Sequence, residues 1–266
     1  METVNRILQE KITARIAPNK AVLIFGARRV GKTVMMRKIV DNYSGRTMML
    51  NGEDYDTLAL LENRSIANYR HLLDGIDLLA IDEAQNIPQI GSILKLIVDE
   101  IPGISVLASG SSSFDLLNKT GEPLVGRSTQ FLLTPFSQRE IAQTETALET
   151  RQNLEARLIY GSYPEVVMME NYERKTDYLR DIVGAYLLKD ILAIDGLKNS
   201  SKMRDLLRLI AFQLGSEVSY DELGKQLSMS KTTVEKYLDL LEKVFVIYRL
   251  GAYSRNLRKE VTKAGK

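Results

Sequence analysis

Short apolar runs separated by polar turns recur along the first half of the chain. They occupy residues 21–25, 46–50, 78–81, 104–109 and 129–133, and Gly, Asp or Pro residues bound them. Runs of this kind are typical of strands buried on both faces of a parallel sheet. Residues 2–16 and 87–101 instead repeat apolar positions at helical spacing, and residues 34–40 can continue as a helix after the first run. The pattern predicts an α/β domain in which helices flank a parallel sheet.

From about residue 141 onward the pattern changes to longer helical periods. Residues 172–192 are typical of one long helix, and residues 204–214, 220–227 and 230–243 predict three more helices. A strand-like run at 244–250 follows, and this order is typical of a winged helix-turn-helix. Ser230 suits the N-cap of the last helix, whose inward face carries Val234, Leu238 and Leu241. We therefore expect an all-α linker region followed by a winged helix-turn-helix domain.

A complete phosphate-loop (Walker A) motif stands between the first apolar run and the following helix. Residues 26–33 read Gly-Ala-Arg-Arg-Val-Gly-Lys-Thr. In such a loop, backbone N–H groups and the helix N-terminus face the phosphates of a nucleoside triphosphate. We expect Lys32 to neutralise the β- and γ-phosphates and the Thr33 hydroxyl to ligate Mg²⁺. The nucleotide contacts predicted around this loop are Gly26, Ala27, Arg28, Arg29, Val30, Gly31, Lys32, Thr33 and Val34, with an outward orientation as the alternative for Arg28 and Arg29.

Two carboxylates, Asp82 and Glu83, end the apolar run at 78–81, as in a Walker B strand beside a phosphate loop. Asp82 is expected to hold Mg²⁺ through water together with Thr33, and Glu83 to act as the general base that polarises the attacking water. With Lys32, Glu83 forms the core of the predicted catalytic set. A strand that ends in acids for solubility is the alternative, but the phosphate loop before it favours the metal site.

The class of phosphate-loop protein follows from three further observations. Glu83 favours a hydrolysing ATPase, since small-molecule kinases need no water-activating acid at this position. GTPases read guanine through Asn-Lys-x-Asp, whereas here Asn118-Lys119 is followed by Thr120-Gly121 and the aspartate is missing. A helicase with two RecA-like cores does not fit into 266 residues. The predicted ligands are therefore ATP and Mg²⁺.

Three other residues are candidates for reading the nucleotide. Ser109 ends the fourth apolar run and Ser111 follows Gly110, so one of them can hydrogen-bond the γ-phosphate or the water as a sensor, although serines in such loops also form turns. Arg127, just before the last run, is a candidate arginine finger that would act on a neighbouring subunit's nucleotide. A structural salt bridge is the alternative for Arg127.

Composition narrows the remaining choices. With 44% apolar and 26% charged residues the chain has the balance of a globular cytoplasmic protein. Cysteine is absent and His71 is the single histidine, which excludes disulfide frameworks, thiolate zinc sites and His-cluster metal sites. The N-terminal residues lack the apolar core of a signal peptide, and no run reaches membrane-spanning length, so no membrane partner is expected.

Charge leaves the question of nucleic acid open. The net charge is +2, but residues 249–266 carry six basic side chains against one acid, Glu260. Such a tail can contact nucleic acid or an acidic partner, or can be a solvated end. The outward face of residues 230–243 mixes both signs, whereas a DNA-reading helix is usually more basic. DNA contact and protein packing both remain possible roles of the winged helix. The outward charges are Lys231, Lys236, Lys243, Glu235, Asp239 and Glu242.

With these residues in place, the chain resembles prokaryotic AAA-type ATPases that join a phosphate-loop core to a winged-helix part and a C-terminal domain of unknown function. The resemblance covers essentially the whole chain, and its first two motifs are widespread among ATPases. The matching motifs are Gly-Ala-Arg-Arg-Val-Gly-Lys-Thr at 26–33, Asp-Glu-Ala-Gln at 82–85, Ser-Gly-Ser-Ser at 109–112, Leu-Val-Gly-Arg at 124–127, Leu-Thr-Pro-Phe-Ser at 133–137, Gly-Ser-Tyr-Pro at 161–164 and Leu-Lys-Asp-Ile at 188–191.

The resemblance implies a domain order and one departure. We expect a phosphate-loop ATPase domain at 1–138, a helical region at 139–200, a winged-helix domain at 201–251 and a basic tail at 252–266. Proteins of this kind usually continue into a nuclease-like module, so the tail is expected to be the start of a module missing from a truncated chain.

The sequence therefore predicts a Mg²⁺-dependent ATPase in which nucleotide state repositions the helical and winged-helix parts. Lys32 and Thr33 would bind phosphate and metal, Asp82 would complete the metal site and Glu83 would activate water. A homo-oligomer would let Arg127 act in trans. The alternatives are a nucleotide-gated switch that barely hydrolyses ATP, and a DNA-binding regulator in which ATP is a secondary ligand.

Overall fold

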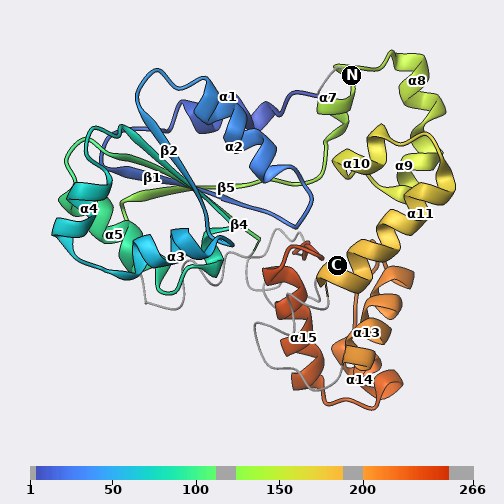
Figure 1. Cartoon of the computed structure of the whole chain (residues 1–266). Coiled ribbons are helices and arrows are strands. Elements are labelled where there is room, and N and C mark those ends of the chain that lie inside the picture. Colours follow the sequence, from blue (N-terminus) through green and yellow to red (C-terminus); the bar gives the residue numbers. More distant parts are fainter. Residues whose placement is uncertain (1–3, 112–123, 188–199, 252–266) are drawn as a thin grey trace, which may run out of the picture. The chain divides into compact units, whose positions relative to one another are not determined.

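The structure is a computed structural model that describes residues 4–111, 124–187 and 200–251 (Figure 1). The chain divides into two compact units, Met1–Leu179 and Arg180–Lys266. The finer division into four segments stays a prediction. In the described part of the chain, no helix combines the length and the apolar character that crossing a membrane requires.

A five-stranded parallel sheet forms the centre of the first unit, with strand order β2-β3-β4-β1-β5. This confirms the predicted α/β class with a parallel sheet, and each strand lies within one residue of its predicted range. The strands are β1 (Lys20–Phe25), β2 (Thr47–Asn51), β3 (Leu78–Asp82), β4 (Ser105–Gly110) and β5 (Ser128–Leu132).

Burial of the strands follows their place in the sheet. All residues of β3 and β4 are buried, and so are those of β1 after Lys20, because these strands lie in the middle with layers on both faces. The edge strands β2 and β5 are only partly covered. In Figure 1, α1 (Ile7–Thr13) and α2 (Lys32–Asp41) lie on one face of the sheet, and α4 (Ile66–Leu72) and α5 (Ile90–Glu100) on the other.

Two helices of the first unit have no counterpart in the predicted pattern. These are α3 (Tyr55–Glu62) and α4, and each starts at a side-chain cap. Asp54 accepts from the backbone N–H of Thr57, and Ser65 accepts from that of Asn68. Such caps satisfy N–H groups that have no partner inside the helix, so they help short helices to form without a long apolar repeat.

A group of short helices follows the sheet within the first unit. Two of them begin with reciprocal capping boxes, Ser137 with Glu140 and Thr146 with Glu149. The helix predicted at 172–192 is continuous over its described residues, as an α-helix to Asp181 and as a π-helical segment over Ile182–Leu187; residues 188–192 lie outside the described part. The helices are α7 (Gln138–Ile141), α8 (Ala147–Gln152), α9 (Leu154–Tyr160), α10 (Pro164–Met168) and α11 (Tyr172–Asp181).

A buried ion pair joins the start of the chain to this helical group. Arg6 Nε lies 3.3 Å from Glu140 Oε1, and both side chains are less than a tenth exposed. The Arg6 guanidinium also stacks over the ring of Phe136, and its Nη2 donates to the carbonyl of Thr134. Removing either partner would leave an uncompensated buried charge, so loss of Arg6 or Glu140 alone should destabilise this part of the fold.

The second unit contains the three predicted helices, α13 (Ser200–Phe212), α14 (Tyr220–Leu227) and α15 (Lys231–Lys243). Ser230 caps α15 by accepting from the Thr233 N–H, and Val234, Leu238 and Leu241 lie in the buried core of this unit. The strand predicted at 244–250 is wrong. Phe245 adopts a left-handed φ of 60°, and the Val246 N–H donates to Leu241 O, so the chain turns back on the helix end instead of extending into a ladder.

Candidate nucleotide-binding site

The loop between β1 and α2 needs glycine at two positions for different reasons. A Cβ on Gly26 would lie 2.2 Å from the carbonyl oxygen of Leu133, so the backbones approach too closely for any side chain. Gly31 has a φ of 94° and stands at the N-cap of α2, where a left-handed residue turns the chain into the helix. The sequence places Gly where the backbone requires it.

Lys32 is turned inward onto this loop. Its side chain is buried, and Nζ donates to the carbonyl oxygens of Gly26 at 3.0 Å and Ala27 at 3.1 Å. The loop carbonyls therefore hold the ammonium group in the concave part of the loop. An ammonium group held at this point is already positioned to bind phosphate oxygens that enter the loop.

The carboxylate of Asp82 is bound from two elements. The Thr33 hydroxyl at the start of α2 donates to Asp82 Oδ2 at 2.6 Å, and the Ser109 hydroxyl at the end of β4 donates to Oδ1. A hydroxyl and a carboxylate side by side are the hard oxygen donors that Mg²⁺ takes in proteins. The donor set fits Mg²⁺, with Thr33 and Asp82 as the residues that would hold it. Among the described residues no group of three or more His, Cys, Asp or Glu side chains gathers as a metal site.

Glu83 is held at both its backbone and its carboxylate. Its φ of 48° is left-handed, and its N–H donates to Ser109 Oγ at 3.2 Å. Its Oε2 accepts from Gln85 Nε2 at 2.5 Å, and the Oε1 of the same amide accepts from the Ser111 N–H at 3.3 Å. Ser109 thus contacts both carboxylate residues, while Ser111 contacts Glu83 only through Gln85. Which serine reads the nucleotide stays a prediction.

Two family models match consecutive parts of the chain. Residues 18–142 match the model described as an AAA domain. This part of the chain is thus similar to AAA domains, and its parallel sheet with flanking helices has the α/β fold of a P-loop NTPase. Residues 151–266 match a domain of unknown function (DUF8612). The AAA match covers the sheet and both carboxylates, and the second match covers most of the short helices and the whole second unit.

Similar curated proteins are themselves uncharacterized. The chain is 24% identical to a protein of Mycobacterium tuberculosis over 92% of this chain and 53% of that protein. It is 20% identical to a protein of Methanocaldococcus jannaschii over 94% of this chain and 60% of that protein. The chain thus spans little more than half the length of these relatives.

Solved structures resemble the chain only distantly. One is a signal transduction ATPase with numerous domains and a tetratricopeptide repeat sensor from Pyrococcus horikoshii, with a TM-score of 0.43 and 12% identity over 90% of this chain and 39% of that chain. Another is a variant of RuvB from Thermotoga maritima, with a TM-score of 0.41 and 14% identity over 91% of this chain and 87% of that one.

The turn at residues 161–164 lies directly beside the phosphate loop. A Cβ built on Gly31 would come within 3.9 Å of Pro164 Cγ. The Phe136 N–H donates to the carbonyl of Ser162 at 2.9 Å, which anchors the turn to the segment after β5. The sequence identified this Gly-Ser-Tyr-Pro segment only as a turn and a matching motif, because no local pattern shows which distant loop a turn will touch.

Arg29 connects the phosphate loop to α10. It has a left-handed φ of 65°, and its Nη1 lies 3.9 Å from Glu165 Oε2, with both side chains about half exposed.

Burial and the neighbouring Glu165 carboxylate raise the pKa of Tyr178 on α11, so the Tyr178 hydroxyl stays protonated at ordinary pH. Of the other loop residues, Val30 is fully buried and Val34 is mostly exposed on the first turn of α2.

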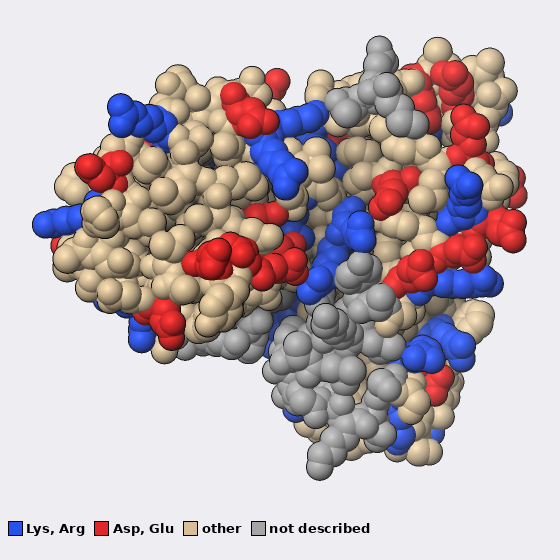
Figure 2. All heavy atoms as spheres, viewed as in Figure 1, with Lys and Arg blue, Asp and Glu red and all other residues tan. Residues whose placement is uncertain are grey.

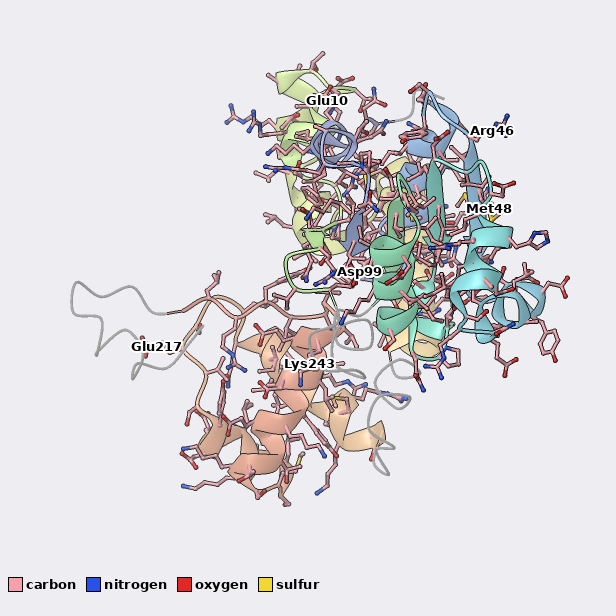
Figure 3. The ribbon with its side chains drawn as sticks, turned by 90° about the vertical axis from the view of Figure 1, so that its left-hand side faces the viewer. Glu10, Arg46, Met48, Asp99, Glu217 and Lys243 are labelled. Carbon is pink, nitrogen blue, oxygen red and sulfur yellow. The ribbon has the colours of Figure 1, made fainter. Side chains whose placement is uncertain are left out.

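Arg127 is not brought to the site within one protomer. Its carbonyl accepts from the Ala21 N–H at the amino end of β1, whereas the phosphate loop follows the carboxyl end of that strand. At about 3.3 Å per strand residue, roughly 16 Å of β1 separates the two ends. The Arg127 guanidinium pairs with Asp99 on α5, the residue labelled in Figure 3. Asn118-Lys119, used to argue against a GTPase, and the motif at 188–191 lie outside the described residues.

Proposed function

We propose that this chain binds ATP with Mg²⁺ and hydrolyses it. The observation that carries the proposal is the cluster in which Thr33 and Ser109 both donate to Asp82 while Glu83 begins the next turn. The match of residues 18–142 to an AAA domain supports the same chemistry. These side chains come from three separate elements, and their convergence beside Lys32 is what a phosphate and metal site requires.

Each residue has a role that follows from its contacts. Lys32 would offset the charge of the β- and γ-phosphates, and Thr33 and Asp82 would hold Mg²⁺, which supplies positive charge to the phosphate oxygens when bound. Glu83 would accept a proton from water as the water oxygen attacks the γ-phosphorus and the bond to ADP breaks, releasing phosphate. Residues 26–34 would bind the nucleotide through their backbone N–H groups and the α2 N-terminus.

Nucleotide state would reach the rest of the first unit through the turn at 161–164. Pro164 of this turn lies next to Gly31 and the Glu165 carboxylate lies 3.9 Å from Arg29 Nη1, so a phosphate in the loop would change the surroundings of both. We propose that the helical region and the winged-helix domain respond through this contact. The domain ranges for this proposal are 1–138, 139–200 and 201–251, with 252–266 as a basic tail.

A slow nucleotide-gated switch is the second candidate. It is favoured by the position of Arg127, since one protomer alone presents no arginine finger from that residue to its own nucleotide. Binding without fast turnover would then be the resting property of the single chain, and assembly into a homo-oligomer would supply Arg127 in trans.

A DNA-binding regulator has less support. In the second unit Lys231 pairs with Asp221 at 3.2 Å, and Arg249 lies near Asp239 and Glu242 at 3.1 Å and 3.7 Å. On the face shown in Figure 2, both signs of charge also alternate over α11. Phosphate contacts make affinity fall steeply with salt, so a flat salt dependence of duplex binding would remove this candidate.

Two substitutions test the assignment of roles. Glu83→Gln should keep ATP binding and lower turnover by about 10²- to 10⁴-fold, because the amide cannot take the proton. Lys32→Ala should weaken binding itself. Steady-state Mg-ATP turnover and the affinity for a fluorescent ATP analogue are measured for both variants, with the exposed Glu53→Gln as matched control. Normal turnover in Glu83→Gln would show that the base is wrongly assigned.

A further inference from the structure

Gln85 is the residue that joins the Glu83 carboxylate to the loop after β4. It lies in a short 3-10 turn, Ala84–Asn86, that follows β3. Its Nε2 donates to Glu83 Oε2 at 2.5 Å, and its Oε1 accepts from the Ser111 N–H at 3.3 Å. One side-chain amide thus spans two strand ends, with the carboxylate on one side and backbone on the other.

The orientation of this amide is determined by its partners. An ionised carboxylate only accepts hydrogen bonds, and a backbone N–H only donates them. Exchanging the Nε2 and Oε1 atoms of Gln85 would therefore break both bonds and place oxygen against oxygen.

The turn does not need the Gln85 side chain in order to form. Its own backbone closes it, since the Asn86 N–H donates to Glu83 O and the Ile87 N–H donates to Ala84 O, each at 3.1 Å. The Gln85 side chain therefore contributes no hydrogen bond to its own turn. Its two contacts are instead with the Glu83 carboxylate and with the loop after β4.

Glu83 has a long side chain, whose carboxylate can take several orientations unless a neighbouring group holds it. Its backbone N–H is held by Ser109, but its carboxylate is reached through three side-chain torsions that each have several wells. The bond from Gln85 to Oε2 restricts these torsions and so determines where the remaining lone pairs of the carboxylate point. Misplacement of a reacting group by about 1 Å can cost on the order of 10²-fold in rate.

We propose that Gln85 is the positioning residue of the general base, and that it ties the orientation of the Glu83 carboxylate to the backbone of Ser111. The inference rests on the proposed hydrolysis of ATP. Gln85 touches no substrate atom in this role. It acts through Glu83, so its loss should affect the rate of the chemical step and not the binding of nucleotide.

Gln85→Glu separates the two contacts of this side chain. The new carboxylate has nearly the same shape and can still accept from Ser111, but it replaces the donor to Glu83 with a like charge. We expect turnover to fall about 10- to 100-fold, while the affinity for a fluorescent, non-hydrolysable ATP analogue changes less than twofold. The matched control is Gln89→Glu, the same chemical change on an exposed side chain that accepts from Arg64.

A double substitution distinguishes positioning from a structural effect. If Gln85 acts only through Glu83, Gln85→Ala should not lower the residual single-turnover rate of Glu83→Gln any further, whereas independent effects would multiply. Wild-type turnover in both Gln85 variants, or a parallel loss of nucleotide affinity, would overturn this inference alone. Absence of Mg-ATP turnover in the wild-type chain would overturn the proposed function and this inference with it.

Discussion

Asp82 and Glu83 are adjacent carboxylates with different environments. Asp82 ends β3, is buried, and accepts hydroxyl donors on both of its oxygens. Glu83 leaves the strand with a left-handed backbone, so its side chain does not continue the alternation of the strand and is partly exposed. In the proposed mechanism, this change of backbone conformation would direct one carboxylate to the metal and the other to water.

Gly52 supports this change of conformation from the neighbouring strand. Its N–H donates to the Asp82 carbonyl at 2.8 Å, and a Cβ at this position would lie 2.4 Å from the Glu83 carbonyl oxygen. The backbone of Asp82 and Glu83 therefore leaves no room for a methyl group. The pairing of Asn51 with Asp82 in the sheet sets this approach.

Gly52→Ala should therefore displace the Glu83 turn. We expect turnover to fall about 10- to 100-fold and the free energy of unfolding to fall by about 1–3 kcal/mol. Thermal unfolding and steady-state turnover measure the two effects. Gly184→Ala is the control, because a Cβ there meets nothing within 4 Å. Equal behaviour of the two variants would show that the sheet edge relaxes without moving Glu83.

At the level of elements, the sequence predicts what a periodic pattern encodes. The five strands lie within one residue of their predicted ranges because each is a short, mostly apolar run bounded by turn residues, even though the edge strands β2 and β5 are only partly covered. The phosphate loop and the carboxylate pair could be named from their spacing. The short helices α3 and α4 could not, since they depend on the caps Asp54 and Ser65 more than on an apolar repeat.

Residues 244–250 were predicted to form a strand, and the structure has none there. Their β-branched and aromatic side chains favour a strand. In the structure Val244 is buried, and Val246 and Ile247 pack against the core of the second unit. These apolar side chains are therefore covered by the helices without forming a strand. Gln85 and Gly52 were missed for a related reason, because their roles depend on which strand ends become neighbours.

The contact between Arg29 and Glu165 belongs to this scale as well, since it joins the phosphate loop to α10. Glu165 places a negative charge near the proposed phosphate-binding loop. Glu165→Gln should raise the affinity for ATP, and because half-exposed pairs contribute about 0.2–1 kcal/mol, the gain should not exceed about fivefold. Titration of a fluorescent ATP analogue at low and high salt checks this, with the exposed Glu170→Gln as control.

The salt dependence of the affinity gain shows whether that gain is electrostatic. A gain that disappears as salt rises is electrostatic, as expected for charges near the surface. A gain that persists at high salt, or one that Glu170→Gln reproduces, would mean that the substitution acts by loosening α10 and not through Arg29.

At the level of the whole molecule, different candidate residues lie at the two ends of the parallel strands. The phosphate loop, Asp82 and Ser109 lie at the carboxyl ends, where open α/β sheets bind ligands. Arg127 lies at the amino end of β5, beside the start of β1. A contribution of Arg127 to hydrolysis therefore requires a second protomer, whereas a structural role requires only Asp99.

Arg127→Ala and Asp99→Asn distinguish these roles because both remove the same ion pair. If Arg127 is a finger in trans, turnover per wild-type protomer should climb with protein concentration, fall about 10³-fold or more in Arg127→Ala, and persist in Asp99→Asn. If the pair is only structural, both variants should show the same small loss at every concentration. Turnover across a dilution series, with sedimentation of the same samples, separates the two. A concentration-independent rate that neither variant changes would leave ATP hydrolysis to the single chain and remove the need for assembly.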